Sequence, residues 1–152
     1  MGARVVDITE LKSLTGQELG VSDWHLVTQD EINTFADATH DHQWIHVDPE
    51  RAKKESPFGG PVAHGYYTLA LAPHLVSQAL DVTGVRMGVN YGLNRLRFTA
   101  PVRIGKRVRV RVAVNSVEDL AAGVQVALGL TYEVEGESKP ACVAEVVYRY
   151  YP

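Results

Sequence analysis

The spacing of hydrophobic positions along the chain changes from helical to alternating near its middle. After Thr28, which begins a capping-box pattern, apolar side chains recur every three or four residues and predict a helix from about Gln29 to Ala38. A second apolar segment, residues 66–80, is hydrophobic on nearly every face. It predicts a helix that is enclosed by other elements and kinked at Pro73.

The second half of the chain alternates apolar and polar residues, as strands with one buried and one solvated face do. Arg107, Arg109 and Arg111 alternate with valines, so they mark a solvated strand face, where they could also attract an acidic cofactor tail. A tight turn is predicted at residues 135–138. The predicted strands are residues 17–27 at an edge of the sheet, 85–97, 107–114, 124–134 and 141–150. An antiparallel sheet wrapped around the apolar helix, an α+β fold, accounts for both halves.

The composition is typical of one ordinary domain spanning residues 1–152. A chain of this length with 45% hydrophobic residues can bury a sufficient core, and its lone Cys142 can form neither an internal disulfide nor a cysteine zinc site. The 15 Lys+Arg and 18 Asp+Glu give a net charge of −3, which provides no basic field for nucleic acid. The N-terminal residues do not form a secretory signal, and no apolar run reaches the roughly 20 residues of a membrane span. The protein is therefore predicted to be cytoplasmic.

Titratable side chains concentrate between the first helix and a second, short helix that is predicted to begin at Asp48-Pro49-Glu50. Asp41 and His46 are five residues apart in a segment expected to be non-helical, so both side chains can be aimed at one point. A carboxylate and a neutral imidazole there can hold and activate a water molecule. A helix-capping and turn role explains the same residues without chemistry. A metal site that adds His40 and His42 fits no standard ligand spacing, so no metal is expected.

A second candidate region is His64-Gly65, at the start of the apolar helix. Free backbone N–H groups at a helix start can stabilise a developing oxyanion, and a glycine lets a ligand approach the backbone closely. The structural alternatives are loop geometry for Gly65 and a core hydrogen bond for His64. Tyr91 and Asn94 in a predicted strand could line a pocket, or could instead be solvated or paired across the sheet.

Two motifs resemble those of the MaoC-like dehydratases, the family of the (R)-specific enoyl-CoA hydratases, and most closely its NodN-like branch. They are Asp41-His42-Gln43-Trp44-Ile45-His46-Val47-Asp48-Pro49 and, before the apolar helix, Pro61-Val62-Ala63-His64-Gly65. The resemblance covers nearly the whole chain. It implies a hot-dog fold, in which an antiparallel sheet wraps a long central helix, here from about Gly65 to Leu80. It also implies a homodimer with its acyl site near the subunit interface.

The resemblance implies a reaction as well: hydration of a trans-2-enoyl thioester, or the reverse dehydration of an (R)-3-hydroxyacyl thioester, carried by coenzyme A or an acyl-carrier protein. Asp41 and His46 would hold the water, and the Gly65 N–H would meet the thioester oxygen. The thioester itself acidifies Cα, so no cofactor is implied, and coenzyme A is part of the substrate. A hot-dog thioesterase and a non-catalytic acyl-binding dimer are the other functions that this fold would allow.

The chain departs from the family pattern at two places. His40 stands where the family usually has a glycine, and histidine is among the residues that tolerate positive φ. His40 is therefore expected to take glycine's conformation beside the Asp/His pair. Gln43-Trp44 replaces the usual Asn-Pro. Gln43 is expected to keep an amide hydrogen bond, and Trp44 to shape the acyl pocket.

Overall fold

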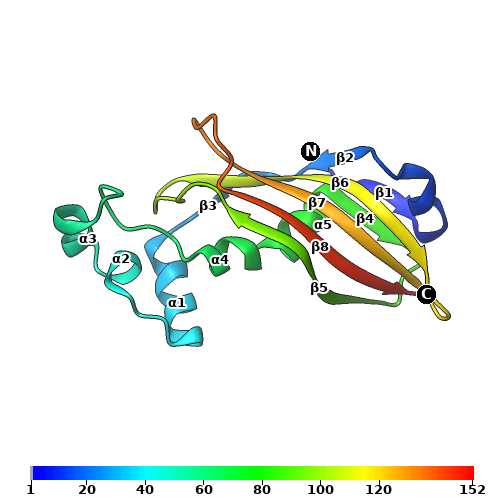
Figure 1. Ribbon diagram of the computed structural model, residues 1–152, viewed down its shortest axis with the longest axis horizontal. Helices are drawn as coiled ribbons and strands as arrows, with labels where there is room; N and C mark the ends of the chain where they lie inside the picture. Colours follow the sequence, from blue (N-terminus) through cyan, green and yellow to red (C-terminus); the bar gives the residue numbers. More distant parts are fainter. Residues whose placement is uncertain (1) are drawn as a thin grey trace.

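A six-stranded antiparallel sheet curves around a helix that is broken into two pieces, α4 (Gly65–Ala70) and α5 (Ala72–Ala79) (Figure 1). The computed structural model describes residues 2–152. The spatial order of the strands is β2 (Glu18–Val21), β6 (Arg107–Asp119), β7 (Val124–Val134), β8 (Cys142–Tyr151) and β5 (Met87–Phe98), and the two-residue strand β3 (His25–Leu26) also pairs with β6. The predicted α+β fold, a sheet wrapped around a helix, is confirmed.

Alternation along β6 and β7 places one face of the sheet against α5. Val110, Val112 and Val114 of β6 are fully buried, whereas the residues between them are partly solvated. They form one core cluster with Leu128 of β7 and Leu75 of α5. Burying a large apolar side chain contributes roughly 1.5–3 kcal/mol. This layer is therefore the main source of stability, and it fixes the direction in which the central helix runs.

The central helix agrees with its prediction in one respect and differs in another. It is interrupted at Leu71, and Pro73 lies in the first turn of α5, so the predicted kink is confirmed. The expectation that the helix is enclosed on every face is wrong for the single chain. The sheet covers one side only, and Tyr66 on the other side is 70% exposed. The chain leaves the helix at Leu80, which begins β4 (Leu80–Thr83).

Other local features follow the sequence less closely. No pattern in the sequence predicts β1 (Arg4–Asp7), which pairs in parallel with β4, or the 3-10 helix η1 (Ile8–Leu14). The predicted edge strand is divided into β2 and β3, because between them the Ser22 hydroxyl accepts the N–H of Val110 (2.9 Å). The turn at residues 135–138 is confirmed, with Gly136 at a φ of 82°.

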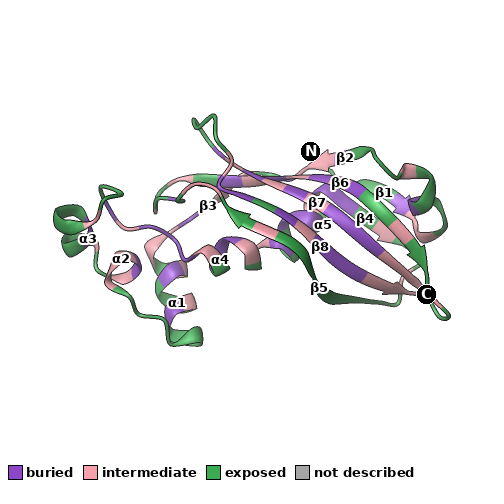
Figure 2. Ribbon diagram, in the orientation of Figure 1, coloured by how far each residue is buried: buried purple, intermediate pink, exposed green. Residues whose placement is uncertain are grey.

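Three short helices, α1 (Gln29–Thr39), α2 (Trp44–Val47) and α3 (Pro49–Glu55), gather at one end of the sheet, near the start of α4 (Figure 1). Their side chains are largely exposed or half-buried (Figure 2). The predicted starts of α1 and α3 are confirmed, since Thr28 accepts the N–H of Glu31 and Asp48 accepts that of Arg51. The helical turn α2 lies in the segment expected to be non-helical. Among residues 2–152, every helix is too short or too polar to cross a lipid bilayer.

Candidate active site

The chain turns sharply between α1 and α2, and this turn presents Asp41. His40 ends α1 with φ 66° and ψ 19°, the left-handed conformation that was expected of it, and it is the one non-glycine residue between 2 and 152 with positive φ. Such a conformation stores strain at a non-glycine residue. The Asp41 carboxylate accepts the N–H of Gln43 (3.3 Å), which closes the turn, and α2 follows at once. His46 on α2 is thereby brought back toward Asp41.

The buried imidazole of His46 is fixed by the segment that precedes α4. Its Nδ1 lies 2.7 Å from the carbonyl oxygen of Val62, and the N–H of Val62 donates to the carbonyl of Ile45 (3.0 Å). Because a carbonyl can only accept, Nδ1 carries the proton and Nε2 keeps a free lone pair. Burial lowers the pKa of His46 below its ordinary value of 6.5. The side chain is therefore a neutral base near pH 7.

His64 connects the two candidate catalytic residues. Its Nε2–H donates to the backbone carbonyl of Asp41 (2.9 Å), and its ring stacks on that of His46 with 3.9 Å between centroids. The Phe35 ring of α1 covers it from another side, at 4.9 Å. Its Nδ1 is buried and makes no hydrogen bond. The His64 ring thus contacts both catalytic candidates: it bonds the backbone of Asp41 and stacks on the imidazole of His46.

Asp41, His46 and His64 form a compact polar group. One nitrogen or carboxylate oxygen from each lies within 4.8 Å of the others, a size that suits one water molecule or one metal ion. The metal alternative that combined His40 and His42 with the pair is not formed. His42 is exposed and lies 2.8 Å from Asp37, and the one cluster between residues 2 and 152 with metal-like spacing contains His64 instead.

An apolar cleft of about 390 Å³ is lined by Ile45 and Gly65, the sequence neighbours of His46 and His64, although Asp41, His46 and His64 themselves are not among its lining residues. Gly65 lies at its wall, and a Cβ there would be 2.9 Å from the Phe98 ring, so the contact with Phe98 requires a glycine at this position. Ile45 and Val62, which flank and hold His46, also face the cleft. The remaining lining is Phe58, Ala63, Thr68, Thr99, Ala100, Pro101, Val102 and Ala141. The polar group therefore borders a space suited to an apolar chain.

Four other residues proposed from the sequence have different surroundings. The backbone N–H of Gln43 closes the Asp41 turn. Its side-chain amide makes no hydrogen bond with residues 2–152, so the expected amide hydrogen bond is not formed there. Trp44 stacks against Arg51 at 4.2 Å and does not line the cleft, which its neighbour Ile45 does.

Tyr91 and Asn94 are also directed elsewhere. Both lie at irregular positions of β5, where the register with β8 shifts. Tyr91 contacts Arg149 at 3.6 Å, and Asn94 donates to Glu145 at 2.7 Å. The structure thus pairs them across the sheet and does not bring them to the polar group within one chain. The residues that sequence reasoning missed are Phe98 and Val62. Neither a distant aromatic contact nor a backbone carbonyl leaves a signal in the sequence.

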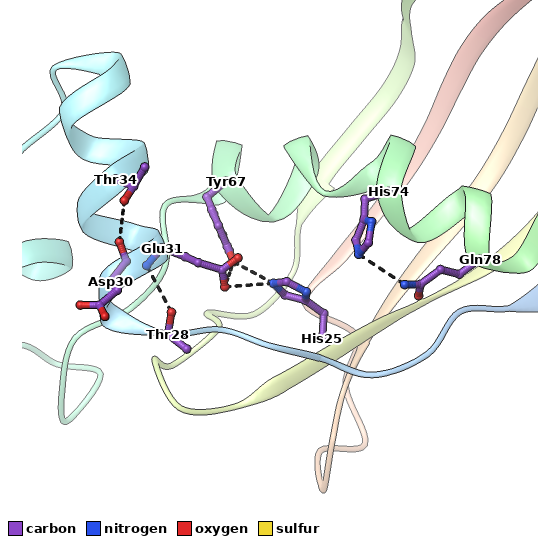
Figure 3. A network of polar contacts seen from close by, with 8 residues as sticks. All are labelled: His25, Thr28, Asp30, Glu31, Thr34, Tyr67, His74 and Gln78. Atoms are coloured by element: carbon purple, nitrogen blue, oxygen red, sulfur yellow. Dashed lines mark hydrogen bonds and ion pairs between the residues drawn. The ribbon is translucent and has the colours of Figure 1, made fainter.

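A second polar cluster ties α1 to α4 beside the candidate site (Figure 3). The Tyr67 hydroxyl donates to Glu31 (3.2 Å), and His25 Nε2 lies 3.1 Å from the same carboxylate oxygen and 3.2 Å from the Tyr67 oxygen. Burial, then the charge of Glu31, raises the pKa of Tyr67, which stays a protonated donor. Tyr67 also meets the Phe35 ring at 5.9 Å. The cluster therefore supports the α1 face that packs on His64.

Comparison with known proteins identifies the family of the chain. Residues 10–135 match the model of the MaoC like domain. The chain belongs to the MaoC-like family. It is 54% identical to "3-hydroxyacyl-thioester dehydratase Z" of Mycobacterium tuberculosis, over 94% of this chain and 95% of that protein. It is also 46% identical to "Nodulation protein N" of Rhizobium meliloti, over 91% and 88% of the two chains.

Solved structures show that this MaoC-like chain has the hot-dog fold of its family. The X-ray structure of a monoamine oxidase regulatory protein from Archaeoglobus superposes with a TM-score of 0.79 at 24% identity, covering 99% of this chain and 98% of that one. The (R)-hydratase from A. caviae involved in PHA biosynthesis superposes with a TM-score of 0.72 at 24% identity, covering 90% and 98%. The hot-dog fold expected of the MaoC-like family is confirmed.

Proposed function

We propose that this protein is an (R)-specific enoyl-CoA hydratase that also acts as a 3-hydroxyacyl-thioester dehydratase. The observation that carries the proposal is the meeting of the Asp41 carboxylate and the neutral His46 at the edge of an apolar cleft beside Gly65. The 54% identical mycobacterial relative, whose name is that of a 3-hydroxyacyl-thioester dehydratase, supports the reaction class. The protein is accordingly a hydro-lyase.

In the proposed mechanism, Asp41 and His46 accept hydrogen bonds from the two protons of one water. The water oxygen bonds to Cβ of the enoyl thioester, and His46 Nε2 takes one proton and delivers it to Cα on the same face. The other proton stays on the new hydroxyl. The negative charge that develops on the thioester oxygen is stabilised by the N–H of Gly65. The thioester supplies the acidity of Cα, so each step uses side chains and backbone of the chain alone.

The experiment compares variants of the pair with matched variants outside it. Asp41→Asn and His46→Gln are each expected to lower kcat with crotonyl-CoA by about 10³-fold, because general acid–base groups contribute about 10²–10⁴-fold. Asp37→Asn and His42→Gln make the same chemical changes at an exposed pair and are expected to retain kcat. The assay follows loss of the enoyl absorbance. Undiminished turnover in both pair variants would overturn the proposal.

The same assay separates the other functions that the fold allows. A thioesterase would release free thiol from crotonyl-CoA, which a thiol reagent detects. A non-catalytic acyl-binding protein would bind enoyl-CoA thioesters and hydrate none of them, whatever their chain length. Either result contradicts the proposed hydratase. A panel of enoyl thioesters with different chain lengths then defines which acyl groups the cleft accepts.

We also propose that the protein works as a homodimer. Strand β5 is the last strand of the sheet, and it is exposed along nearly its whole length (Figure 2). Long apolar edge strands are templates for pairing with another chain. Its exposed apolar side chains are Met87, Val89, Tyr91, Leu93 and Phe98. Light scattering is expected to give twice the chain mass of 16.7 kDa, and a mass of one chain would contradict the proposal.

The cytoplasmic location stays a prediction.

A further inference from the structure

Three carboxylates, Glu18, Glu133 and Glu135, balance the charge of the three alternating arginines of β6. Arg109 and Arg111 both pair with Glu133, at 2.9 and 3.0 Å, and Arg111 also pairs with Glu18 at 3.3 Å. Arg107 lies 3.9 Å from Glu135. Each guanidinium therefore already has a carboxylate partner from a neighbouring segment. The idea that this row attracts an acidic cofactor tail loses its support.

A different set of cations lies next to the apolar cleft. Arg103 and Lys106, from the loop between β5 and β6, and Lys139, from the loop between β7 and β8, line a small hollow of about 160 Å³. This hollow and the cleft share two wall residues, Ala100 and Pro101. The two spaces therefore lie next to each other, on either side of Ala100 and Pro101.

Arg103 is held in position between the two spaces. Its guanidinium donates to the carbonyl of Gly59 (3.1 Å), in the loop that places Phe58 against the cleft. A Cβ at Gly60 would lie 3.3 Å from the same guanidinium, so the side chain is packed along this loop. Within residues 2–152 the Arg103 guanidinium makes this one hydrogen bond, which leaves its other N–H donors for a ligand.

The hollow is positive in a protein that is negative as a whole. Its one acidic lining residue, Glu137, lies 3.7 Å from Lys106, which is a long ion pair. Lys139 makes no ion pair with any residue from 2 to 152, and Arg103 makes none either. Three cations and one carboxylate leave a local charge of +2, against −3 for the chain. Phosphate groups are the ligands that such a cluster of Arg and Lys recognises.

We propose that Arg103, Lys106 and Lys139 bind the phosphate groups of coenzyme A when its acyl thioester occupies the cleft. The assignment rests on the proposed function, which places the thioester carbonyl at Gly65, inside the cleft. The pantetheine arm then leads out of the cleft, and the diphosphate and 3′-phosphate of coenzyme A reach the cations. Thioesters whose carrier lacks the nucleotide forgo these contacts.

The test compares crotonyl-CoA with crotonyl-N-acetylcysteamine, which has the same reacting group and no phosphate. The double variant Arg103→Gln/Lys139→Gln is expected to raise KM for crotonyl-CoA about tenfold, as the loss of two partly exposed charge contacts would. The measured quantity is the KM for crotonyl-CoA divided by the KM for crotonyl-N-acetylcysteamine. This ratio is expected to rise about tenfold in the double variant. Added salt is expected to raise the same ratio in the unmodified protein. A ratio that stays constant in the variant would overturn the assignment.

A matched control and a binding measurement separate this inference from the proposed function. Lys12→Gln removes a cation of η1, which pairs with Asp119 at the opposite end of the molecule, and is expected to leave the ratio unchanged. Calorimetry with coenzyme A alone needs no turnover. Binding that weakens in the double variant supports the phosphate site even if crotonyl-CoA is not hydrated. Hydration with binding that is equal in both proteins contradicts the site and leaves the hydratase standing. A variant effect confined to the thioester of an acyl-carrier protein also contradicts it.

Discussion

The curved sheet and the segment from α1 to the start of α4 differ in how their central side chains are held. The sheet relies on fully buried aliphatic side chains of β6, β7 and α5, which contact one another in a continuous cluster. The other segment contains short helices and packs on the sheet through a smaller apolar cluster that includes Ile32 of α1. Its two central rings depend on single hydrogen bonds, from His46 to Val62 and from His64 to Asp41. Stability and turnover should therefore respond to different substitutions.

The largest effect on stability is expected in the sheet. Leu128 of β7 is fully buried, and Leu128→Ala leaves a cavity as well as losing apolar burial. The free energy of unfolding should fall by about 3 kcal/mol, within the range of such substitutions. Urea denaturation measures it. At temperatures where the variant stays folded, kcat should not change, which would confirm that the sheet supports the site without taking part in it.

Leu26→Ala provides the matched control, because Leu26 on β3 is 45% exposed. It should cost about 0.5 kcal/mol or less, as surface substitutions usually do. If both leucines cost the same, or if Leu128→Ala lowered kcat as strongly as a variant of Asp41, the separation between the two regions would not hold.

The same contrast explains how much of the molecule was predictable. Alternation along β6 is a local property of the sequence, and it is sufficient to identify both the strand and its buried face. The partners of its arginines are not local. Glu133 and Glu135 reach them through the register of β7 on β6, which no single-chain pattern specifies. The sequence therefore predicts the solvated strand face that carries the arginines, but it does not predict the carboxylates that pair with them.

Only the site residues that belong to a sequence motif could be predicted. Asp41 and His46 are found by their spacing, and the positive φ of His40 follows from its place in the family pattern. The hydrogen bond that orients His46 cannot be predicted from the sequence. Every residue has a backbone carbonyl, and only the fold brings that of Val62 to the His46 ring. Trp44 was expected at the acyl pocket, whereas the cleft is formed by its neighbour Ile45 and by Phe98 from β5.

A substitution at the border of the two regions should affect turnover more than stability. In Gly65→Ala, the new Cβ would lie 2.9 Å from the Phe98 ring, which must move. Because that ring lines the cleft, kcat/KM for crotonyl-CoA should fall about tenfold, or about 1.4 kcal/mol. Because the Phe98 ring is 46% exposed and can move, the free energy of unfolding should fall much less than in Leu128→Ala.

The double variant Gly65→Ala/Phe98→Leu tests the cause, since a smaller side chain at position 98 makes room for the Cβ and should restore part of kcat/KM relative to Phe98→Leu alone. Gly92→Ala on β5 is the matched control, because a Cβ there meets nothing within 4 Å. A loss that persists unchanged in the double variant would mean that Gly65 is needed for a reason other than its contact with Phe98.

A smaller effect is expected at the polar cluster that ties α1 to α4. Tyr67→Phe keeps the ring beside Phe35 and removes the hydroxyl that donates to Glu31. Loss of one hydrogen bond of this kind should lower the free energy of unfolding by about 1 kcal/mol. The neighbouring Tyr66→Phe changes an exposed hydroxyl and should have no measurable effect. Equal losses in the two variants, measured by urea denaturation, would show that the cluster contributes nothing to the attachment of α1.

The smallest effect concerns the pH dependence of stability through His46, whose pKa in the folded chain is lowered by burial. Above its ordinary value of 6.5, the imidazole is neutral in both the folded and the unfolded chain. As the pH falls below 6.5, the unfolded chain takes up a proton first, so stability decreases until the pH reaches the lowered pKa and then changes no further through this group. His46→Gln should remove this part of the decrease, so the variant should lose less stability than the unmodified protein between neutral and mildly acidic pH. Urea denaturation of both proteins across that range measures it, with His42→Gln as the exposed control. An unchanged pH dependence in His46→Gln would show that burial of this ring carries no cost in acid, and the neutral base of the proposed mechanism would lose its physical basis.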